Sequence, residues 1–157
     1  MTLARDVVAA AIAKGLTITT AESCTGGMVS AAITDIAGSS AMFERGFVTY
    51  SNTAKVEMVS VSEATLDAHG AVSEEVAAQM ATGAANAARA DVAVSITGIA
   101  GPGGSEHKPE GRVCFGVAAG GSVQTKTVEF GPIGRAQVRQ RSVEAALTLI
   151  AEAIDSL

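Results

Sequence analysis

The sequence predicts an α/β protein of three layers (α/β/α), in which helices cover both faces of one mixed β-sheet. Short apolar segments rich in β-branched residues alternate with amphipathic helical segments along most of the chain, which is typical of a largely parallel sheet. Near the C-terminus, two consecutive strands are joined only by Gly120-Gly121, which indicates an antiparallel hairpin. The chain has 157 residues and shows no repeat or linker, so residues 1–157 are interpreted as a single domain.

The N-terminal part begins with a helix and a strand. A helix is expected over residues 2–15, because Thr2 can cap its start, apolar residues recur at helical spacing, and Gly15 ends it. Residues 16–22 are rich in β-branched residues and predict a strand. The segment SCTGG at 23–27 is expected to open a second helix, which runs to about Asp35. After it we expect a loop at 38–40, a strand at 42–51, and short helices at 52–60 and 63–69.

The C-terminal half contains the clearest helix, over residues 73–90. Ser73 is a good N-cap there, and Glu74 and Glu75 suit the positive end of the helix dipole. Residues 91–98 are apolar, as in a buried strand. The elements expected after it are a Gly/Pro-rich loop at 99–111, hairpin strands at 112–119 and 122–130, and a final helix at about 135–155.

Composition narrows the class of protein. The chain is 48% hydrophobic and 17% charged, with no Trp, one Tyr and four Phe, so its core must be aliphatic. A net charge of −5 argues against nucleic acid as a partner, because neutralising phosphates needs a basic surface. No apolar run is long enough for a membrane helix and no signal peptide precedes the first helix, so we expect a cytoplasmic protein. Two cysteines are too few for a disulfide framework.

The segment Ser23-Cys24-Thr25-Gly26-Gly27 is the first candidate for chemistry. A small nucleophile that follows a strand and opens a helix would lie among free N–H groups, which lower its pKa and can bind an oxyanion. The two glycines would let a substrate approach the backbone. Ser23 is equally a preferred N-cap residue, so the pattern alone is also consistent with a capping role.

The cysteines give a rival interpretation. A thiolate of Cys24 at a helix N-terminus would also attack an amide, although a free cysteine is more often a small buried residue. Cys114 lies inside an apolar strand and is interpreted as core. No Cys or His pair has the spacing of metal ligands, so no metal site is expected.

A nucleophilic serine needs a base, and histidine is a poor candidate here. His69 precedes Gly70 at a helix end and His107 lies in a polar loop, and neither has a recognisable triad partner. Lys55 is the alternative, since the first turn of a helix disfavours its charged form and so lowers its pKa. Tyr50 and Asn52 lie at the same junction; the tyrosine hydroxyl could relay a proton or only satisfy a buried polar atom.

Two further features suggest ligand binding. The glycine-rich segment from Thr97 through Gly98 and Gly101 to Ser105 could bind phosphate through backbone N–H groups, or be a plain loop. Arg139 lies on the apolar stripe of the last helix, so it needs either an ion-pair partner or an anionic ligand.

Several motifs together resemble the CinA C-terminal family, the nicotinamide-nucleotide amidohydrolases or NMN deamidases. The resemblance covers almost the whole chain, and the motifs occur in the order of the family. They are AESCTGG (21–27), AGSSAMFERGFVTYSNTAK (37–55), GAVSEEVAAQMA (70–81), SITGIAGPGG (95–104) and KPEGRV (108–113).

This resemblance implies hydrolysis of nicotinamide mononucleotide to nicotinate mononucleotide and ammonia, without metal or organic cofactor, in a homodimer or higher oligomer. It implies Ser23 as nucleophile and Lys55 and Tyr50 as catalytic partners. It places further site residues at Ser40 and Thr97, and an arginine at Arg139, with Arg135 and Arg141 close by. The expected substrate-binding positions are Cys24, Thr25, Gly26, Gly27, Ser40, Asn52, Thr97, Gly98, Gly101 and Arg139.

In the expected mechanism, neutral Lys55 takes the proton of Ser23, which attacks the carboxamide and forms an acyl-enzyme that water hydrolyses. Arg139 and the glycine-rich loop would hold the phosphate or ribose. Two alternatives remain open: a nucleotide-binding or regulatory module without amidase activity, and a Cys24-dependent amidase acting on another substrate. Many relatives also carry a second domain that resembles molybdopterin-binding proteins, which is absent from this sequence.

Overall fold

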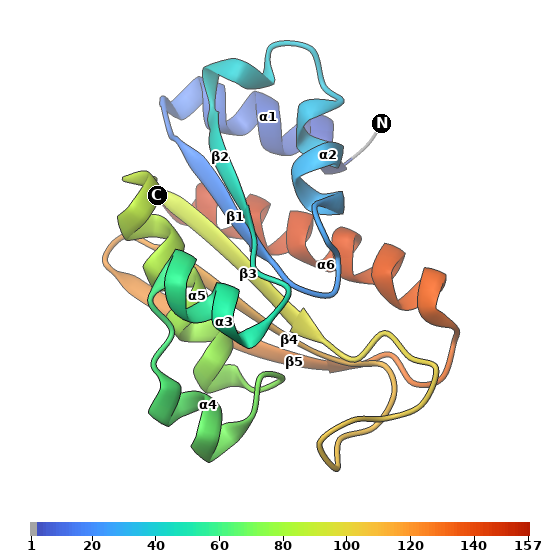
Figure 1. Cartoon of the computed structure of the whole chain (residues 1–157). Helices are drawn as coiled ribbons and strands as arrows, with labels where there is room; N and C mark the ends of the chain where they lie inside the picture. The colour runs from blue at the N-terminus through green and yellow to red at the C-terminus, as the bar shows by residue number, and fades with distance from the viewer. Residues whose placement is uncertain (1–2) are drawn as a thin grey trace.

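The computed structural model of the chain describes residues 3–157, and its centre is a five-stranded sheet in the order β2-β1-β3-β4-β5 (Figure 1). Strands β1, β2 and β3 are parallel, and β4 pairs antiparallel with both β3 and β5. The strands are β1 (Ile18–Glu22), β2 (Phe43–Val48), β3 (Val92–Gly98), β4 (Arg112–Ala119) and β5 (Ser122–Glu129).

Helices cover both faces of the sheet (Figure 1). One face carries α1 (Leu3–Lys14), α2 (Met28–Thr34) and α6 (Arg135–Ser156), and the other carries α3 (Asn52–Val59), α4 (Glu63–His69) and α5 (Glu74–Ala88). A short 3-10 turn, η1 (Ser39–Ala41), precedes β2. The predicted mixed sheet with helices on both sides and a C-terminal hairpin is therefore confirmed.

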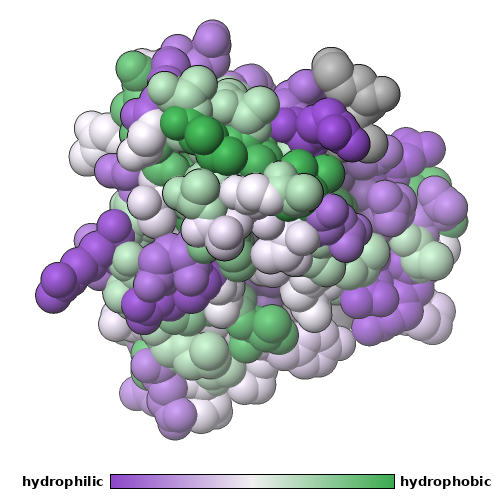
Figure 2. Space-filling view, turned by 90° about the horizontal axis from the view of Figure 1, so that it is seen from above, coloured by the Kyte–Doolittle hydropathy of each residue, from purple (hydrophilic) through white to green (hydrophobic). Residues whose placement is uncertain are grey.

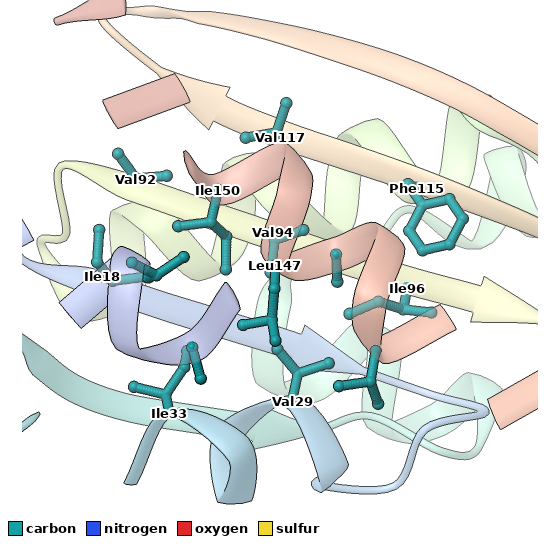
Figure 3. Close-up of a cluster of buried hydrophobic side chains, with 14 of the residues drawn as sticks. Ile18, Val29, Ile33, Val92, Val94, Ile96, Phe115, Val117, Leu147 and Ile150 are labelled. Atoms are coloured by element: carbon teal, nitrogen blue, oxygen red, sulfur yellow. The ribbon is translucent and has the colours of Figure 1, made fainter. Parts of the chain in front are cut away.

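The core is aliphatic, as the composition requires. Its larger part lies between the sheet and the α1–α2–α6 layer, where strand residues pack against helix residues (Figure 3). Ile18, Val94 and Ile96 from the strands are completely buried there, against Leu147 and Ile150 of α6. A smaller cluster lies under α5 on the opposite face. Both faces of the central strands are thus buried, which explains why β3 is apolar throughout.

Most predicted helix and strand boundaries agree with the structure within about two residues. Ser73 caps α5 by accepting a hydrogen bond from the Val76 N–H, and α4 ends before Gly70 as expected. The predicted Thr2 cap lies outside the described residues. Within residues 3–157, no helix is long and apolar enough to span a bilayer.

The helix predicted to begin with SCTGG is the main error. Residues 24–27 form turns, and α2 begins only at Met28. Gly26 and Gly27 have φ values of 55° and 105°, in the left-handed region that an α-helix cannot use. The glycines therefore end one turn and delay the helix. Ser23 is not its N-cap, because Gly27 holds that position.

The sheet register decides which loops meet. Glu22 at the end of β1 pairs with Val48 of β2 and with Ile96 of β3, so these parallel strands end at the same edge. The residues that follow each strand therefore converge there, as in other open α/β sheets that bind ligands. Ser40 precedes β2 and lies at the opposite edge.

The surface mixes polar and apolar side chains. Hydrophobic residues gather in a band among hydrophilic ones on the face drawn in Figure 2. Exposed large hydrophobic side chains include Leu3 and Ile12 of α1, and Val48 and Tyr50 at and beyond the end of β2.

Candidate active site

A hydrogen bond between Lys55 and Ser23 forms the centre of the site. The Lys55 Nζ donates to Ser23 Oγ at 3.1 Å, so the predicted pair is within proton-transfer distance. Ser23 directly follows β1, and its N–H donates to the Ile96 carbonyl of β3 at 2.9 Å. Lys55 lies in the first turn of α3, which Ser51 caps by accepting from the Ala54 N–H. Sheet and helix therefore position the two side chains independently.

Lys55 is buried to an unusual degree for a lysine. Only 1% of its surface is exposed, and its amine also donates to the carbonyls of Thr49 at 3.0 Å and Tyr50 at 3.1 Å. Burial lowers the pKa of the Lys55 ammonium, while the negative charge of Glu106 partly opposes that shift. The result is an amine that loses its proton more readily than a surface lysine and can act as a base.

Cys24 lies beside the pair but has the wrong protonation state for a nucleophile. It is buried, and burial raises the pKa of its thiol to about 12. The helix N-terminus that was expected to stabilise its thiolate is absent at this position. Cys114 is also buried, which agrees with its interpretation as core.

Among the described residues, the Tyr50 hydroxyl forms no hydrogen bond with Ser23 or Lys55. Tyr50 is 60% exposed, and its hydroxyl accepts a hydrogen bond from Arg135 Nη2 at 3.4 Å. Its backbone carbonyl contacts these two side chains instead, accepting from Lys55 Nζ and, at 3.4 Å, from Ser23 Oγ. Tyr50 therefore holds the pair through its main chain, which a sequence pattern cannot indicate.

A pocket of about 320 Å³ opens over the pair. This volume lies at the small end of the range for ligand sites, about 300–1,000 Å³. The predicted residues that line it are Ser23, Cys24, Tyr50, Asn52, Lys55, Thr97, Gly98 and Gly101. Thr97 also donates to the Ala71 carbonyl at 2.9 Å. The glycine-rich loop thus forms a wall of the pocket.

Five of the expected substrate-binding residues do not line this pocket. Thr25 is fully buried and donates to the Glu22 carboxylate at 2.7 Å. Gly26 and Gly27 shape the turn that leads to α2. Ser40, at the other edge of the sheet, is correspondingly distant from Ser23. The fifth residue is Arg139.

The two candidate arginines have different surroundings. Arg139 Nε donates to the Cys24 carbonyl at 3.0 Å and Nη2 to the Thr25 carbonyl at 3.4 Å, so it supports the turn behind the serine. Arg135, one turn earlier on α6, lines the pocket, and its Nη1 donates to the Gly101 carbonyl at 2.8 Å. Helical spacing places both near the site but does not indicate which one faces the cavity.

Glu22 is a structural residue that the sequence analysis did not single out. Its buried carboxylate accepts from Thr25 Oγ1, the Val29 N–H, and both the N–H and hydroxyl of Ser30. It therefore anchors the start of α2 to the end of β1. A carboxylate at the end of an apolar strand is the signal that could have revealed it, because such a group must be fully paired.

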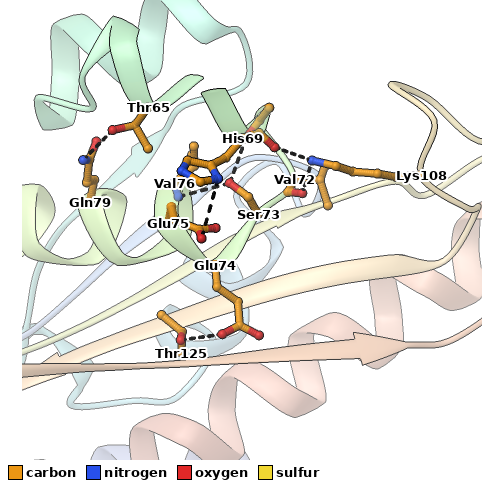
Figure 4. Close-up of polar contacts among 11 residues, drawn as sticks. Thr65, His69, Val72, Ser73, Glu74, Glu75, Val76, Gln79, Lys108 and Thr125 are labelled. Carbon is orange, nitrogen blue, oxygen red and sulfur yellow. Dashed lines mark hydrogen bonds and ion pairs between the residues drawn. The ribbon is translucent and has the colours of Figure 1, made fainter. Parts of the chain in front are cut away.

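The loop after β3 is fastened to the α4–α5 junction. Lys108 Nζ donates to the carbonyls of His69 and Val72, both at 2.6 Å (Figure 4). The His69 ring lies 3.6 Å from the Glu75 carboxylate, and His107 is exposed at the tip of the loop. Neither histidine lines the pocket. Within residues 3–157, no group of three or more His, Cys, Asp or Glu residues is placed to hold a metal ion.

Comparison with known proteins assigns the chain to one family. The model of the CinA C-terminal domain matches residues 1–154, and the chain belongs to this family.

Two curated relatives are similar to the chain. It is 58% identical over 151 residues to the nicotinamide-nucleotide amidohydrolase PncC of Escherichia coli (strain K12), covering 95% of this chain and 92% of the relative. It is 54% identical over 154 residues to a CinA-like protein of Mycobacterium sp. (strain MCS), covering 97% of this chain and 36% of that longer protein.

A solved structure of similar fold is the competence/damage inducible protein CihA from Agrobacterium tumefaciens. Its TM-score is 0.93 at 47% sequence identity, with 98% of this chain and 93% of that chain covered.

Proposed function

We propose that this protein is a nicotinamide-nucleotide amidohydrolase that converts nicotinamide mononucleotide to nicotinate mononucleotide and ammonia, with Ser23 as nucleophile and Lys55 as base. The observation that carries the mechanism is the 3.1 Å contact between Lys55 Nζ and Ser23 Oγ at the floor of a pocket. The substrate follows from the relatives named nicotinamide-nucleotide amidohydrolase.

The reaction begins with proton transfer. Neutral Lys55 accepts the Ser23 proton while the serine oxygen attacks the carboxamide carbon. Lys55 then returns the proton to the leaving nitrogen, and ammonia departs from the acyl-enzyme. A water molecule attacks the ester with Lys55 again as base, which releases the carboxylate product and restores the Ser23 hydroxyl.

The oxyanion of the tetrahedral intermediate needs hydrogen-bond donors. The backbone N–H groups of Cys24 and Thr25 follow the nucleophile directly and donate to no other residue among those described. Arg139 donates to the Cys24 carbonyl, which shares a peptide plane with the Thr25 N–H, so this contact fixes the orientation of one of the two donors. Preorganised donors of this kind contribute about 3–4 kcal/mol to transition-state stabilisation in serine hydrolases.

The nucleotide end of the substrate lies toward the glycine-rich loop. Arg135 is the guanidinium that lines the pocket, and it carries the positive charge that a phosphate requires. This assigns substrate binding to Arg135 and turn support to Arg139. Thr97, Gly98 and Gly101 complete that wall.

The same proposal covers assembly and location. We propose a cytoplasmic location. A charged nucleotide does not cross a bilayer unaided, so the enzyme must share a compartment with its substrate. The exposed apolar side chains support association into a homodimer or higher homo-oligomer. Neither metal nor organic cofactor takes part in the proposed steps.

The test is an assay of ammonia release from nicotinamide mononucleotide, with nicotinamide and glutamine as control substrates. We expect release from the mononucleotide and little from either control. Binding of the mononucleotide without ammonia release would instead indicate a regulatory module. Activity that is lost with Cys24→Ala would indicate a cysteine amidase, which the raised thiol pKa disfavours.

A further inference from the structure

The pocket is lined by one carboxylate, Glu106, that takes no part in the proposed reaction steps. Among its described lining residues, Lys55 and Arg135 are basic and Glu106 is acidic. Within residues 3–157, no hydrogen bond or ion pair at normal distance holds the Glu106 side chain, whereas Arg135 donates to Gly101 and Tyr50. The Glu106 carboxylate lies near the Lys108 amine, but no hydrogen bond occupies its oxygens, so they can contact a molecule in the pocket.

The backbone places Glu106 at the tip of a tight turn. Ser105 and Lys108 exchange two backbone hydrogen bonds of 3.0 and 2.8 Å, and the two residues between them have φ values of 50° and 62°. This is the geometry of a type I′ turn, whose central positions favour glycine or asparagine. Glu106 and His107 occupy these positions instead, so the conformation of the turn does not explain the choice of either residue.

Neighbouring residues keep the turn in this place. The contacts of Lys108 with His69 and Val72 fasten its base to the α4–α5 junction. Gly70 lies between His69 and Val72 in the chain, and a Cβ at position 70 would collide with the Glu106 carboxylate. The absence of a side chain at position 70 thus leaves the room that the carboxylate occupies beside the pocket.

We propose that Glu106 is a specificity-determining residue that recognises the positively charged pyridinium ring of the substrate. This inference rests on the proposed function, because the ring charge is a property of a nicotinamide nucleotide. When the carboxamide carbon lies at Ser23, the attached ring must occupy the same small pocket that Glu106 lines. A carboxylate there stabilises a cationic ring and gains nothing from a neutral one.

Binding to an inactive enzyme tests this directly. In a Ser23→Ala background, calorimetry would compare nicotinamide mononucleotide with its reduced form, which keeps the ribose and phosphate but has a neutral dihydropyridine ring. We expect the oxidised form to bind about fivefold more tightly, as for one partly exposed charge pair. Adding Glu106→Gln should remove this preference by weakening the oxidised form alone, and Glu106→Asp should retain most of it.

His107→Asn is the matched control, since it changes the other central residue of the turn, which does not line the pocket. It should leave the preference intact. Equal weakening of both ligands by Glu106→Gln, or no change with either, would overturn the inference. Ammonia release by the unmodified enzyme separates the two claims. Release together with an unchanged ring preference refutes only the role of Glu106, and absence of release refutes the proposed function itself.

Discussion

The amine of Lys55 lies 3.1 Å from the hydroxyl of Ser23, although 32 positions separate the two residues in the chain. The parallel pairing of β1 and β2 creates this contact, because both strands end at one edge of the sheet. Ser23 follows β1 directly, and α3 follows β2 after a short turn. The contact between Ser23 and Lys55 therefore depends on the sheet topology and on the Ser51 cap that begins α3.

Removal of the Ser23 hydroxyl should abolish turnover. Ser23→Ala removes the hydroxyl that we propose as the nucleophile, and we expect ammonia release to fall by at least about 10³-fold. The side chain is small and its main-chain bond to Ile96 remains, so the thermal midpoint should change little. The measurements are steady-state ammonia release and a thermal melt of the same preparation.

Cys24→Ala is the matched control on the adjacent residue. A thiol with a pKa of about 12 stays protonated at neutral pH, so this variant should keep most of the activity. Iodoacetamide at neutral pH should likewise leave the enzyme active. The reverse outcome, with the cysteine variant inactive and the serine variant active, would assign the nucleophile to Cys24.

Sequence patterns predict the architecture well because its elements have strong local signals. The Ser73 cap, the Gly120-Gly121 turn and the apolar β3 segment each specify their element without reference to the rest of the chain. The start of α2 predicted at residue 23 is wrong, because contacts outside the local sequence pattern determine where this helix begins. The buried Glu22 carboxylate binds the helix N-terminus, and the left-handed glycines separate Ser23 from it.

Sequence patterns predict which residues of the site follow the ends of parallel strands. They do not predict how a helix is rotated or which way a main-chain carbonyl points. Ser23 and Lys55 both follow parallel strands, so topology brings them together. Whether Arg135 or Arg139 faces the pocket depends on the rotation of α6, and the use of the Tyr50 carbonyl depends on main-chain direction. Glu106 joins the site only through a turn whose residues are atypical for its geometry.

The pH dependence of the rate should report Lys55. With the neutral amine as the proposed base, the rate should rise with pH. Burial lowers the pKa of Lys55 from the ordinary 10.5, so the midpoint of this rise should lie below that value. The Glu106 carboxylate opposes this shift, so Glu106→Gln should move the midpoint to lower pH.

Lys55→Arg is the control for this assignment. It keeps a cation in place, but a guanidinium does not lose its proton, so the rate should fall by roughly 10²–10⁴-fold. A Lys55→Arg enzyme with near-normal activity would show that the base is another group.

The two arginines of α6 should differ in kinetic effect. Arg135→Met removes the guanidinium that lines the pocket, and we expect KM for nicotinamide mononucleotide to rise roughly tenfold. Nicotinamide riboside lacks the phosphate, so its KM should change little. Arg139→Met instead frees the carbonyls of Cys24 and Thr25, which should lower kcat with both substrates and lower the thermal midpoint. Matching KM effects of the two variants would contradict this division of roles.

Glu22→Gln should destabilise the fold. The carboxylate accepts hydrogen bonds from Thr25, Val29 and Ser30 on both oxygens, and an amide replaces one acceptor oxygen with an NH₂ donor. Buried donors are then left without an acceptor, which costs about 2–3 kcal/mol of unfolding free energy. Urea unfolding measures this loss, with Glu152→Gln on the exposed side of α6 as the same chemical change, which should stay within about 0.5 kcal/mol of the unmodified protein. Equal stability of the two variants would show that the Glu22 network contributes little, and the delayed start of α2 would then be due to the glycines alone.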